Sequence, residues 1–406
     1  MFLDCCQLRS AILALMLVFL ITCVQGQSKL SEAPNVIQIK LERYGWQRLP
    51  PPVRHEAWPT VKRLMTVDSK GRTLVGYTER QSGELATRGT PERLFHILRF
   101  TPAGELDLSV SLPTNTVSNN AVFVDSQDHI LAVANEMLQI LTGDERTPAP
   151  KRVWKPLTSC SWDSQRCQIN QTPTRRKLFV TRCLGQVQGK VCDNPAIAAY
   201  DTSSFEPVAA DDCNYRFGRS GMLSDTFVYG SQWTGGANWP LYTTHRRSLC
   251  RSDFQQELPL DDIVCAVLND DLFVVDRLGK KNKWQLGVVT AHGENKFRVE
   301  LPKHDMPALS IDDVKSDAVG DRFAIVIDTL RGGVAAFDVG GHLTARRIVV
   351  YSSDSGSQLT SVSVYPPVPH YGVALGIVPG FTFDLSPDGH ILAVLSGGTL
   401  IVTKIE

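Results

Sequence analysis

The sequence predicts an all-β fold built from repeats, and three observations lead to that prediction. Beyond residues 1–26, runs with the 3.6-residue apolar period of a helix are scarce. One theme recurs along the chain: a short apolar strand, a tight polar turn and a second short apolar strand. The turn of this unit returns about every 50 residues, a period typical of folds whose repeats are four-stranded blades.

The clearest unit is FTFDLSPDGHILAVL at residues 381–395. In its turn, Pro387 fixes φ and Gly389 supplies a positive φ, so the chain reverses between two apolar strands. Similar units, weaker in the last two cases, occupy residues 64–77, 121–134, 263–275, 314–327, 177–183 and 221–230.

One turn residue serves as a landmark in each unit, and the seven landmarks are Gly71, Asp128, Arg176, Asp225, Asp270, Asp321 and Gly389. Seven landmarks predict a β-propeller of seven blades, each of four antiparallel strands. Third and fourth strands fit between the landmarks, as at residues 95–112 and 196–210. The longest interval, around residues 366–369, leaves room for an insertion or a degenerate blade, so six and eight blades are alternatives.

The two ends of the repeat region predict how the ring closes. After Gly389 only two more strands fit, so the last blade lacks its outer strand. Residues 36–42 (VIQIKLE) alternate apolar and polar side chains, as expected for an edge strand. We expect this N-terminal strand to complete the last blade, which would remove an exposed edge.

The segment FDLSPDGHILAVLSGGTLIV resembles the "SPDG plus apolar strand" unit of WD40-like, YVTN-like and TolB-type β-propeller repeats. The resemblance covers one blade well and four others loosely. The Trp-Asp blade ending of WD40 repeats is absent where it would be placed, and so are the paired glycines of kelch repeats. Members of this superfamily include scaffolds, binding modules and accessory domains of enzymes, so the resemblance implies a fold more than a function.

Residues 1–26 are interpreted as a secretory signal peptide, and residues 27–406 as a single propeller domain. Arg9 precedes the apolar run Ala11–Val24, which is shorter than the about 20 residues of a bilayer span. Cleavage after Gly26 would leave a secreted or periplasmic protein with no membrane span. An uncleaved anchor is the alternative.

Seven cysteines remain after the leader, clustered in one part of the chain. In an oxidising compartment such clusters indicate disulfides. The local candidates are Cys160–Cys167 and Cys183–Cys192, with Cys213–Cys250 as a longer closure. Cys265 would be left over as a buried, unreactive thiol in the run IVCAV.

Composition and motifs argue against several classes of function but do not identify one. The chain has 42 Lys and Arg residues and 42 Asp and Glu residues, so its formal net charge is zero. This balance gives no reason to expect nucleic acid as a partner. Nucleophile elbows, zinc-protease helices and phosphate-binding loops are not found. No cofactor is indicated, although a divalent cation such as Ca²⁺ is compatible with the carboxylates described next.

The resemblance implies a propeller geometry in which two sets of loops share one face around the axis. These are the loops that enter the first strand of each blade and the loops that join its second strand to its third. The residues that precede the turn landmarks by nine positions should lie there. Two successive blades carry Asp pairs at this position, which could bind a cation or a polar ligand, or merely form turns. The polar candidates are Lys62, Arg63, Asn119, Asn120, Arg216, Asp261, Asp262, Asp312 and Asp313.

The second-to-third connections on this face are expected to be long in the first three or four blades and short in the sixth and seventh. Trp233 and Trp239 flank a Gly-rich stretch that we expect to form one such loop. Exposed tryptophans on loops are frequent binding devices, while packing beneath their own loop is the alternative.

The function that the sequence favours is non-catalytic binding of a protein, glycan or small polar ligand through the loop-decorated axial face. The alternative is a propeller hydrolase or lyase that uses the clustered carboxylates, possibly with a divalent cation. No catalytic residue is assigned, and we favour the binding function because no paired catalytic signature is found.

Overall fold

A computed structural model describes part of the chain. The described residues are 35–46, 64–78, 93–114, 120–134, 137–141, 152–154, 167–183, 187–188, 191–192, 195–204, 222–235, 241–248, 255–260, 262–278, 283–307, 314–331, 342–364 and 381–406. The chain divides into two compact units, Met1–Val36 and Ile37–Glu406. Among the described residues no helix combines the length and the apolar character needed to cross a bilayer.

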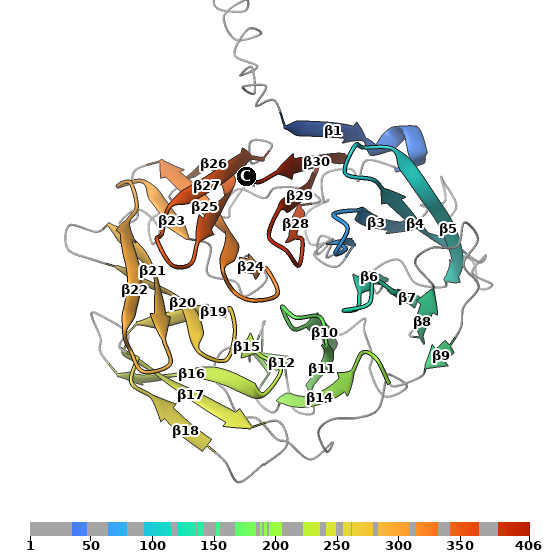
Figure 1. The fold of residues 1–406 in the computed structure, drawn as a ribbon. Coiled ribbons are helices and arrows are strands. Elements are labelled where there is room, and N and C mark those ends of the chain that lie inside the picture. Colours follow the sequence, from blue (N-terminus) through green and yellow to red (C-terminus); the bar gives the residue numbers. More distant parts are fainter. Residues whose placement is uncertain are drawn as a thin grey trace, which may run out of the picture. The chain divides into compact units, whose positions relative to one another are not determined.

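The second unit is a ring of seven antiparallel sheets, the blades, each with its first strand innermost (Figure 1). Blade one contains β2 (Met65–Val67), β3 (Thr73–Thr78), β4 (Arg93–Phe100) and β5 (Leu106–Thr114), and blade two contains β6 (Ala121–Val124), β7 (Ile130–Ala134), β8 (Met137–Leu141) and β9 (Arg152–Trp154). Blade three contains β10 (Cys167–Gln171), β11 (Lys177–Cys183) and β14 (Pro195–Asp201), with the small hairpin β12 (Val187–Gln188) and β13 (Val191–Cys192) between the last two.

The remaining blades continue in sequence order around the ring. Blade four contains β15 (Met222–Leu223), β16 (Phe227–Gly235), β17 (Leu241–Ser248) and β18 (Gln255–Leu258), and blade five contains β19 (Ile263–Val267), β20 (Leu272–Leu278), β21 (Trp284–Thr290) and β22 (Asn295–Glu300). Blade six contains β24 (Val314–Ser316), β25 (Arg322–Arg331), β26 (His342–Ser352) and β27 (Gln358–Ser363), and β23 (Asp305–Pro307) also pairs with β25. Blade seven contains β28 (Thr382–Leu385), β29 (Ile391–Ser396), β30 (Thr399–Lys404) and β1 (Val36–Lys40).

The predicted seven-bladed propeller is confirmed, and so is its closure by an N-terminal strand. Strand β1 lies beside β30, although the two are at opposite ends of the chain (Figure 1). It is shorter than the predicted 36–42, because the chain turns at Leu41 into the 3₁₀ segment η1 (Leu41–Tyr44). Gly45 ends η1 with φ +88°, a conformation in which a side chain would be strained.

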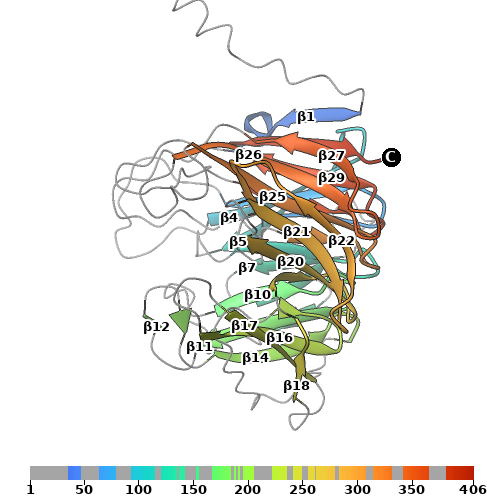
Figure 2. The ribbon, with the colours of Figure 1, turned by 90° about the vertical axis from the view of Figure 1, so that its left-hand side faces the viewer.

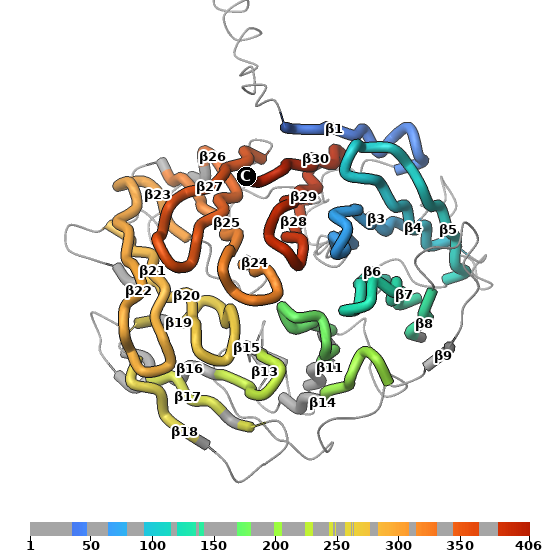
Figure 3. Tube along the Cα trace, viewed as in Figure 1, coloured from blue at the N-terminus to red at the C-terminus, as the bar shows by residue number. Residues whose placement is uncertain are grey.

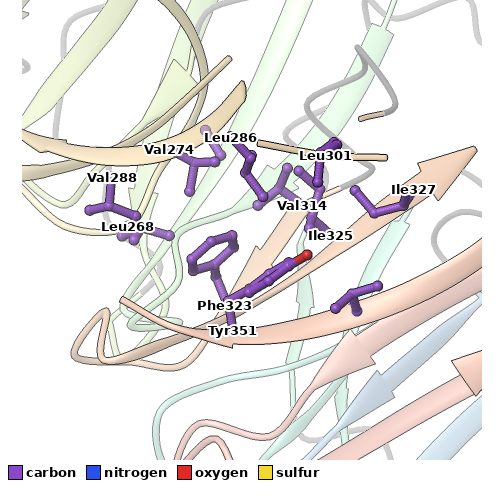
Figure 4. Close-up of a cluster of buried hydrophobic side chains, with 12 residues drawn as sticks. Leu268, Val274, Leu286, Val288, Leu301, Val314, Phe323, Ile325, Ile327 and Tyr351 are labelled. Carbon is purple, nitrogen blue, oxygen red and sulfur yellow. The ribbon is translucent and has the colours of Figure 1, made fainter. Parts of the chain in front are cut away.

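The hydrophobic core lies between neighbouring blades, because each sheet packs on the next. One cluster joins blades five and six, where the rings of Phe323 and Tyr351 stack with centroids 5.7 Å apart (Figure 4). Leu268, Val274 and Val288 of blade five pack against the same cluster. The inner strands are buried on both faces, which explains why sequences such as AVFV lack alternation.

All seven turn landmarks fall between the first and second strands of their blades, as predicted. The expected connection lengths were partly wrong. In blade six, β25 continues to Arg331 and residues 332–341 follow it, where a short connection was expected. In blade two only residues 135–136 separate β7 from β8, where a long one was expected. The Gly-Gly pair at 332–333 suggests a turn, but strand length depends on packing against the neighbouring blade.

Candidate functional site

The strands run between two ends of the blades, seen from the side in Figure 2. We call the end with the connections from first to second strands the turn face. We call the opposite end, where first strands begin and second strands lead to third strands, the loop face. The turns after β6, β10, β24 and β28 lie around the centre of the ring (Figure 3). The ligand-binding candidates from the sequence belong to the loop face.

The structure describes only some of those candidates. Lys62, Arg63, Asn119, Arg216, Trp239, Asp261, Asp312 and Asp313 lie outside the described residues, as do Cys160, Cys213 and Cys250. The predicted convergence of four aspartates is therefore still a prediction. Within the described part of the chain, no three His, Cys, Asp or Glu residues form a group that could hold a metal ion.

Asn120 directly precedes β6 and is only 5% exposed. Its side-chain oxygen accepts a hydrogen bond from Thr114 Oγ1 at 3.1 Å, and its Nδ2 donates one to Thr78 Oγ1 at 2.7 Å. Thr78 and Thr114 end β3 and β5 of blade one. Asn120 therefore ties blade two to blade one at the loop face, and its amide is engaged in the scaffold.

Asp262 directly precedes β19 and is also buried. Both carboxylate oxygens accept from Arg298, from Nη1 at 3.2 Å and from Nη2 at 2.6 Å. Arg298 belongs to β22, the outermost strand of the same blade. This bidentate pair is a strong, geometrically specific interaction, so the Asp262 carboxylate is held by its own blade.

Trp233 was expected in a loop, but it lies within β16, paired with Tyr242 of β17 at a register shift. The Gly-rich stretch begins inside the strand, because a bulge accommodates the extra residue there. Cys167, Cys183 and Cys192 lie in β10, β11 and β13, and the disulfide pairings remain predictions. Cys265 is present as a thiol. Burial is the main cause that raises the pKa of this thiol well above its ordinary value, and the negative charge of Asp276 is the second.

At the turn face, each blade closes its first turn with one short polar side chain. Asp317, for example, accepts from the backbone N–H groups of Gly320 at 2.6 Å and Asp321 at 3.0 Å. Such side-chain caps replace backbone partners within a tight turn. The turn-closing residues are Asp68, Asp125, Thr172, Ser224, Asn269, Asp317 and Ser386. Burial raises the pKa of the Asp68 and Asp317 carboxyls above the ordinary 3.8.

Five of these turns place a residue with positive φ two positions before the second strand. Gly71, Gly320 and Gly389 occupy this position in three blades, and Asp128 with φ 64° occupies it in blade two. Blade three places Arg175 there, with φ 62°. An arginine gains nothing locally from a left-handed backbone, which costs about 1–2 kcal/mol. Strain of this kind often marks a residue with a role elsewhere.

The Arg175 side chain is 6% exposed and extends from blade three to the junction of blades seven and one. Its Nη1 donates to the carbonyl oxygen of Val67, and its Nη2 donates to Asp384 Oδ2 and Leu385 O, both at 3.2 Å. Asp384 Oδ2 also accepts from Val67 N at 2.9 Å. Arg175 therefore links three blades across the axis.

Hydrogen bonds also cross every boundary between neighbouring blades near the turn face, at donor–acceptor distances from 2.7 to 3.3 Å. Taken around the ring, they join Ser69 N to Asp128, Gln171 Nε2 to Val124 O, Thr174 Oγ1 to Asp225, Tyr229 OH to Asp270 O, Asn269 Nδ2 to Val319 O, Ala318 N to Pro387 O, and Thr66 Oγ1 to Asp384. Polar groups of the turn face are thus used to fasten the ring.

Arg175 is not among the residues predicted from the sequence, although the sequence carries a signal for it. Aligning the turns places Arg175 in the column that holds Gly71, Gly320 and Gly389. A large cation at a position that requires positive φ is an anomaly readable from the sequence. The partner Asp384 has no such signal, because its contacts with Thr66 and Arg175 depend on which blades are neighbours.

No model of a protein family matches the sequence, and no curated protein matches it. Among solved structures, the chain is similar to the β-propeller domain of the Trilobed protease from Pyrococcus furiosus, with 10% identity, TM-score 0.44, and 82% of this chain and 89% of that one covered. It is similar to a putative TolB from Agrobacterium tumefaciens, with 8% identity, TM-score 0.39, and coverage of 71% and 90%. It is also similar to a chain of a mitotic checkpoint complex, with 12% identity, TM-score 0.40, and 88% of this chain and 97% of that one covered. These are likenesses of fold alone.

Proposed function

We propose that this protein is an extracytoplasmic propeller that binds a protein, glycan or small polar ligand through its loop face, without catalysing a reaction. The proposal rests on the difference between the two ends of the blades.

One observation carries the proposal: five of the long connections leave the described strands at the loop face, whereas the turns between first and second strands are fastened by their own polar groups. Residues 47–63, 79–92, 155–166, 332–341 and 365–380 all connect strand ends of the loop face. Connections held by a rigid scaffold are where binding residues concentrate. A ring joined at every blade boundary and across its axis is such a scaffold.

The geometry of Asp262 favours binding over acid–base catalysis at this face. A carboxylate held by both guanidinium nitrogens of Arg298 is not positioned to take a proton from a substrate. A divalent cation such as Ca²⁺ is retained as one candidate ligand, with Asp261, Asp312 and Asp313 as its proposed oxygen donors.

The extracytoplasmic location is proposed from the apolar run Ala11–Val24 and its preceding Arg9. N-terminal sequencing of the protein exported by an expressing cell should find Gln27 as the first residue. An intact leader on a membrane-bound product would contradict the proposed cleavage and support the anchor.

The binding proposal is tested by thermal-shift screening against cations, sugars and small acids. Bound ligand at 100 times its Kd stabilises a protein by about 2.7 kcal/mol, which gives a measurable rise in Tm. The test variant replaces residues 79–92 and 332–341 with Asn-Gly turns. The matched control replaces residues 142–151, which connect β8 to β9 at the turn face.

We expect a ligand that raises the Tm of the native chain to lose its effect in the loop-face variant and keep it in the control. Equal shifts in both variants would argue against the loop face as the site. Chemical turnover of a sugar or acid that raises Tm would instead support the hydrolase or lyase alternative.

A further inference from the structure

The turn face contains a cavity of about 280 Å³ that the proposed function does not use. Turns from five blades line it: Ser69 from blade one, Asp125, Ser126 and Asp128 from blade two, Thr174, Arg175 and Arg176 from blade three, Ala318 and Val319 from blade six, and Pro387 from blade seven. Ligand sites of drug-sized molecules usually measure about 300–1,000 Å³. A cavity this small accommodates one or two side chains rather than a large ligand.

One wall of the cavity is apolar and includes a valine held in solvent. Val319 is 62% exposed, and it and Leu106 are the large hydrophobic side chains that stand exposed in the described part of the chain. Its backbone cannot easily turn inward, because Asn269 Nδ2 donates to Val319 O at 2.9 Å and Ala318 N donates to Pro387 O at 2.9 Å. The scaffold therefore holds the Val319 side chain exposed at the cavity, where a partner could cover it.

The rest of the lining is polar, and most of its charged groups already have partners. Asp125 closes its own turn and contacts His129 Nδ1 at 2.8 Å. Asp128 accepts from Ser69, and Arg175 is held by Asp384. A ligand would thus meet carboxylates whose oxygens already accept local donors.

Two lining groups remain available. The Arg176 guanidinium and the Ser126 hydroxyl are exposed, and within the described residues neither has a side-chain partner. The lining carries two Asp and two Arg residues, so its formal charges balance, but the charge that is open to a ligand is the positive one of Arg176. An open guanidinium group pairs well with a carboxylate, and a hydroxyl group in the same lining can also donate to one.

We propose that this cavity docks a protein partner through a short exposed segment in which an acidic residue adjoins a large aliphatic one. The partner's carboxylate pairs with Arg176 and Ser126, and its aliphatic side chain covers Val319 and Pro387. A volume of about 280 Å³ fits the one or two side chains that the tip of a protein loop would insert, and it is too small for a drug-sized ligand. This site lies at the opposite end of the blades from the loop face. A test that contradicts one of the two proposals therefore leaves the other unaffected.

The probe is a biotinylated peptide, Gly-Ser-Asp-Leu-Ser-Gly, displayed on streptavidin so that several copies raise the avidity. Peptides with Asn for Asp, or Ser for Leu, are the matched ligands. The test variants are Arg176→Glu and Val319→Ser. Their controls are Lys303→Glu, an exposed cation outside the cavity, and Leu106→Ser, the other exposed hydrophobic residue.

We expect the full chain to bind the Asp-Leu peptide. It should bind each of the two altered peptides more weakly than the Asp-Leu peptide. Arg176→Glu should weaken binding about tenfold and Val319→Ser about fivefold. The two control variants should bind as the native chain does. Equal Tm values for all four variants would show that folding is unaffected.

Three results would overturn the proposal: no binding of the Asp-Leu peptide at millimolar concentration, equal binding of the Asn-Leu peptide, or binding unchanged by Arg176→Glu and Val319→Ser. Trimming of residues 79–92 should leave this binding intact. If that trimming removes it, the peptide binds at the loop face instead.

Discussion

The turn face and the loop face are formed by the same strands, yet they use polar side chains in different ways. At the turn face, Asp128, Thr174 and Asn269 each bond to a neighbouring blade, and Arg175 spans the axis. At the loop face, Asn120 ties two blades together, but Asp262 is held within its own blade. One end therefore fixes the ring, while the other bears connections whose lengths differ from blade to blade, from residues 397–398 to residues 79–92.

The largest expected effect tests whether the turn face holds the ring. Arg175→Ala should lower the free energy of unfolding by about 3–5 kcal/mol, because the Asp384 carboxylate would lose its buried cation. Arg175→Gly should cost about 1–2 kcal/mol less, since glycine accepts the positive φ. Urea denaturation measures both. Arg176→Ala, an exposed neighbour, is the control, and a loss as large as that of Arg175→Ala would contradict the assigned role.

The second effect tests whether the loop face also has a structural anchor. Asn120→Ala leaves Thr78 and Thr114 without the amide they contact in a buried site, which should cost about 1–3 kcal/mol. Asn120→Asp, of similar size, keeps an acceptor for Thr114 but loses the donor to Thr78. Thermal and urea unfolding should rank it between the native chain and the alanine variant. A neutral Asn120→Ala would mean that the loop face contributes little to ring closure.

A smaller effect concerns the turn-closing residues. Asn269→Ala removes the acceptor for the backbone N–H groups of Asp271 and Leu272 and the donor to Val319 O, for a cost of about 1 kcal/mol. Asn269→Asp should restore the turn but not the link to blade six. Comparing their unfolding free energies separates closure of the turn from bonding between blades. Equal unfolding free energies for the native chain and Asn269→Asp would show that the hydrogen bond between the blades contributes nothing measurable to stability.

The smallest effect is a pH dependence. Because burial raises the pKa of Asp317 in the folded state, the folded protein retains that proton to higher pH than the unfolded chain does. The associated stabilisation is full below 3.8 and is lost as pH rises through the raised pKa. The stability of the native chain relative to Asp317→Asn should therefore increase as pH falls from 7 toward 4. Urea midpoints across this range provide the measurement, and an opposite slope would refute the direction.

The blade pattern could be predicted from the sequence because it is carried by local chemistry. The turn at Pro387–Gly389 and the apolar strands around it need no knowledge of neighbours. The same holds for the pairing of β1 with β30, because a missing outer strand and an alternating segment at the other chain end were both visible.

The contacts across blade boundaries could not be predicted in this way. Asp384 meets Thr66 and Arg175 only after the ring has closed, and those residues are far apart in sequence. Nor could the sequence fix how far β25 extends or that β16 includes Trp233, because strand length depends on the adjoining blade. The four-aspartate site is still a prediction, with Asp262 alone in the described part of the chain.

The reach of Arg175 has a consequence for how the chain is made. Blades one to three leave the ribosome long before Asp384 and β30 are synthesised, because these lie near the C-terminus. Until then β1 lacks its neighbour, and the Arg175 guanidinium has no carboxylate to meet. Contacts of such long sequence separation form late and slowly. Nascent chains of this protein would therefore expose an open sheet edge throughout synthesis and depend on its protection until the last blade emerges.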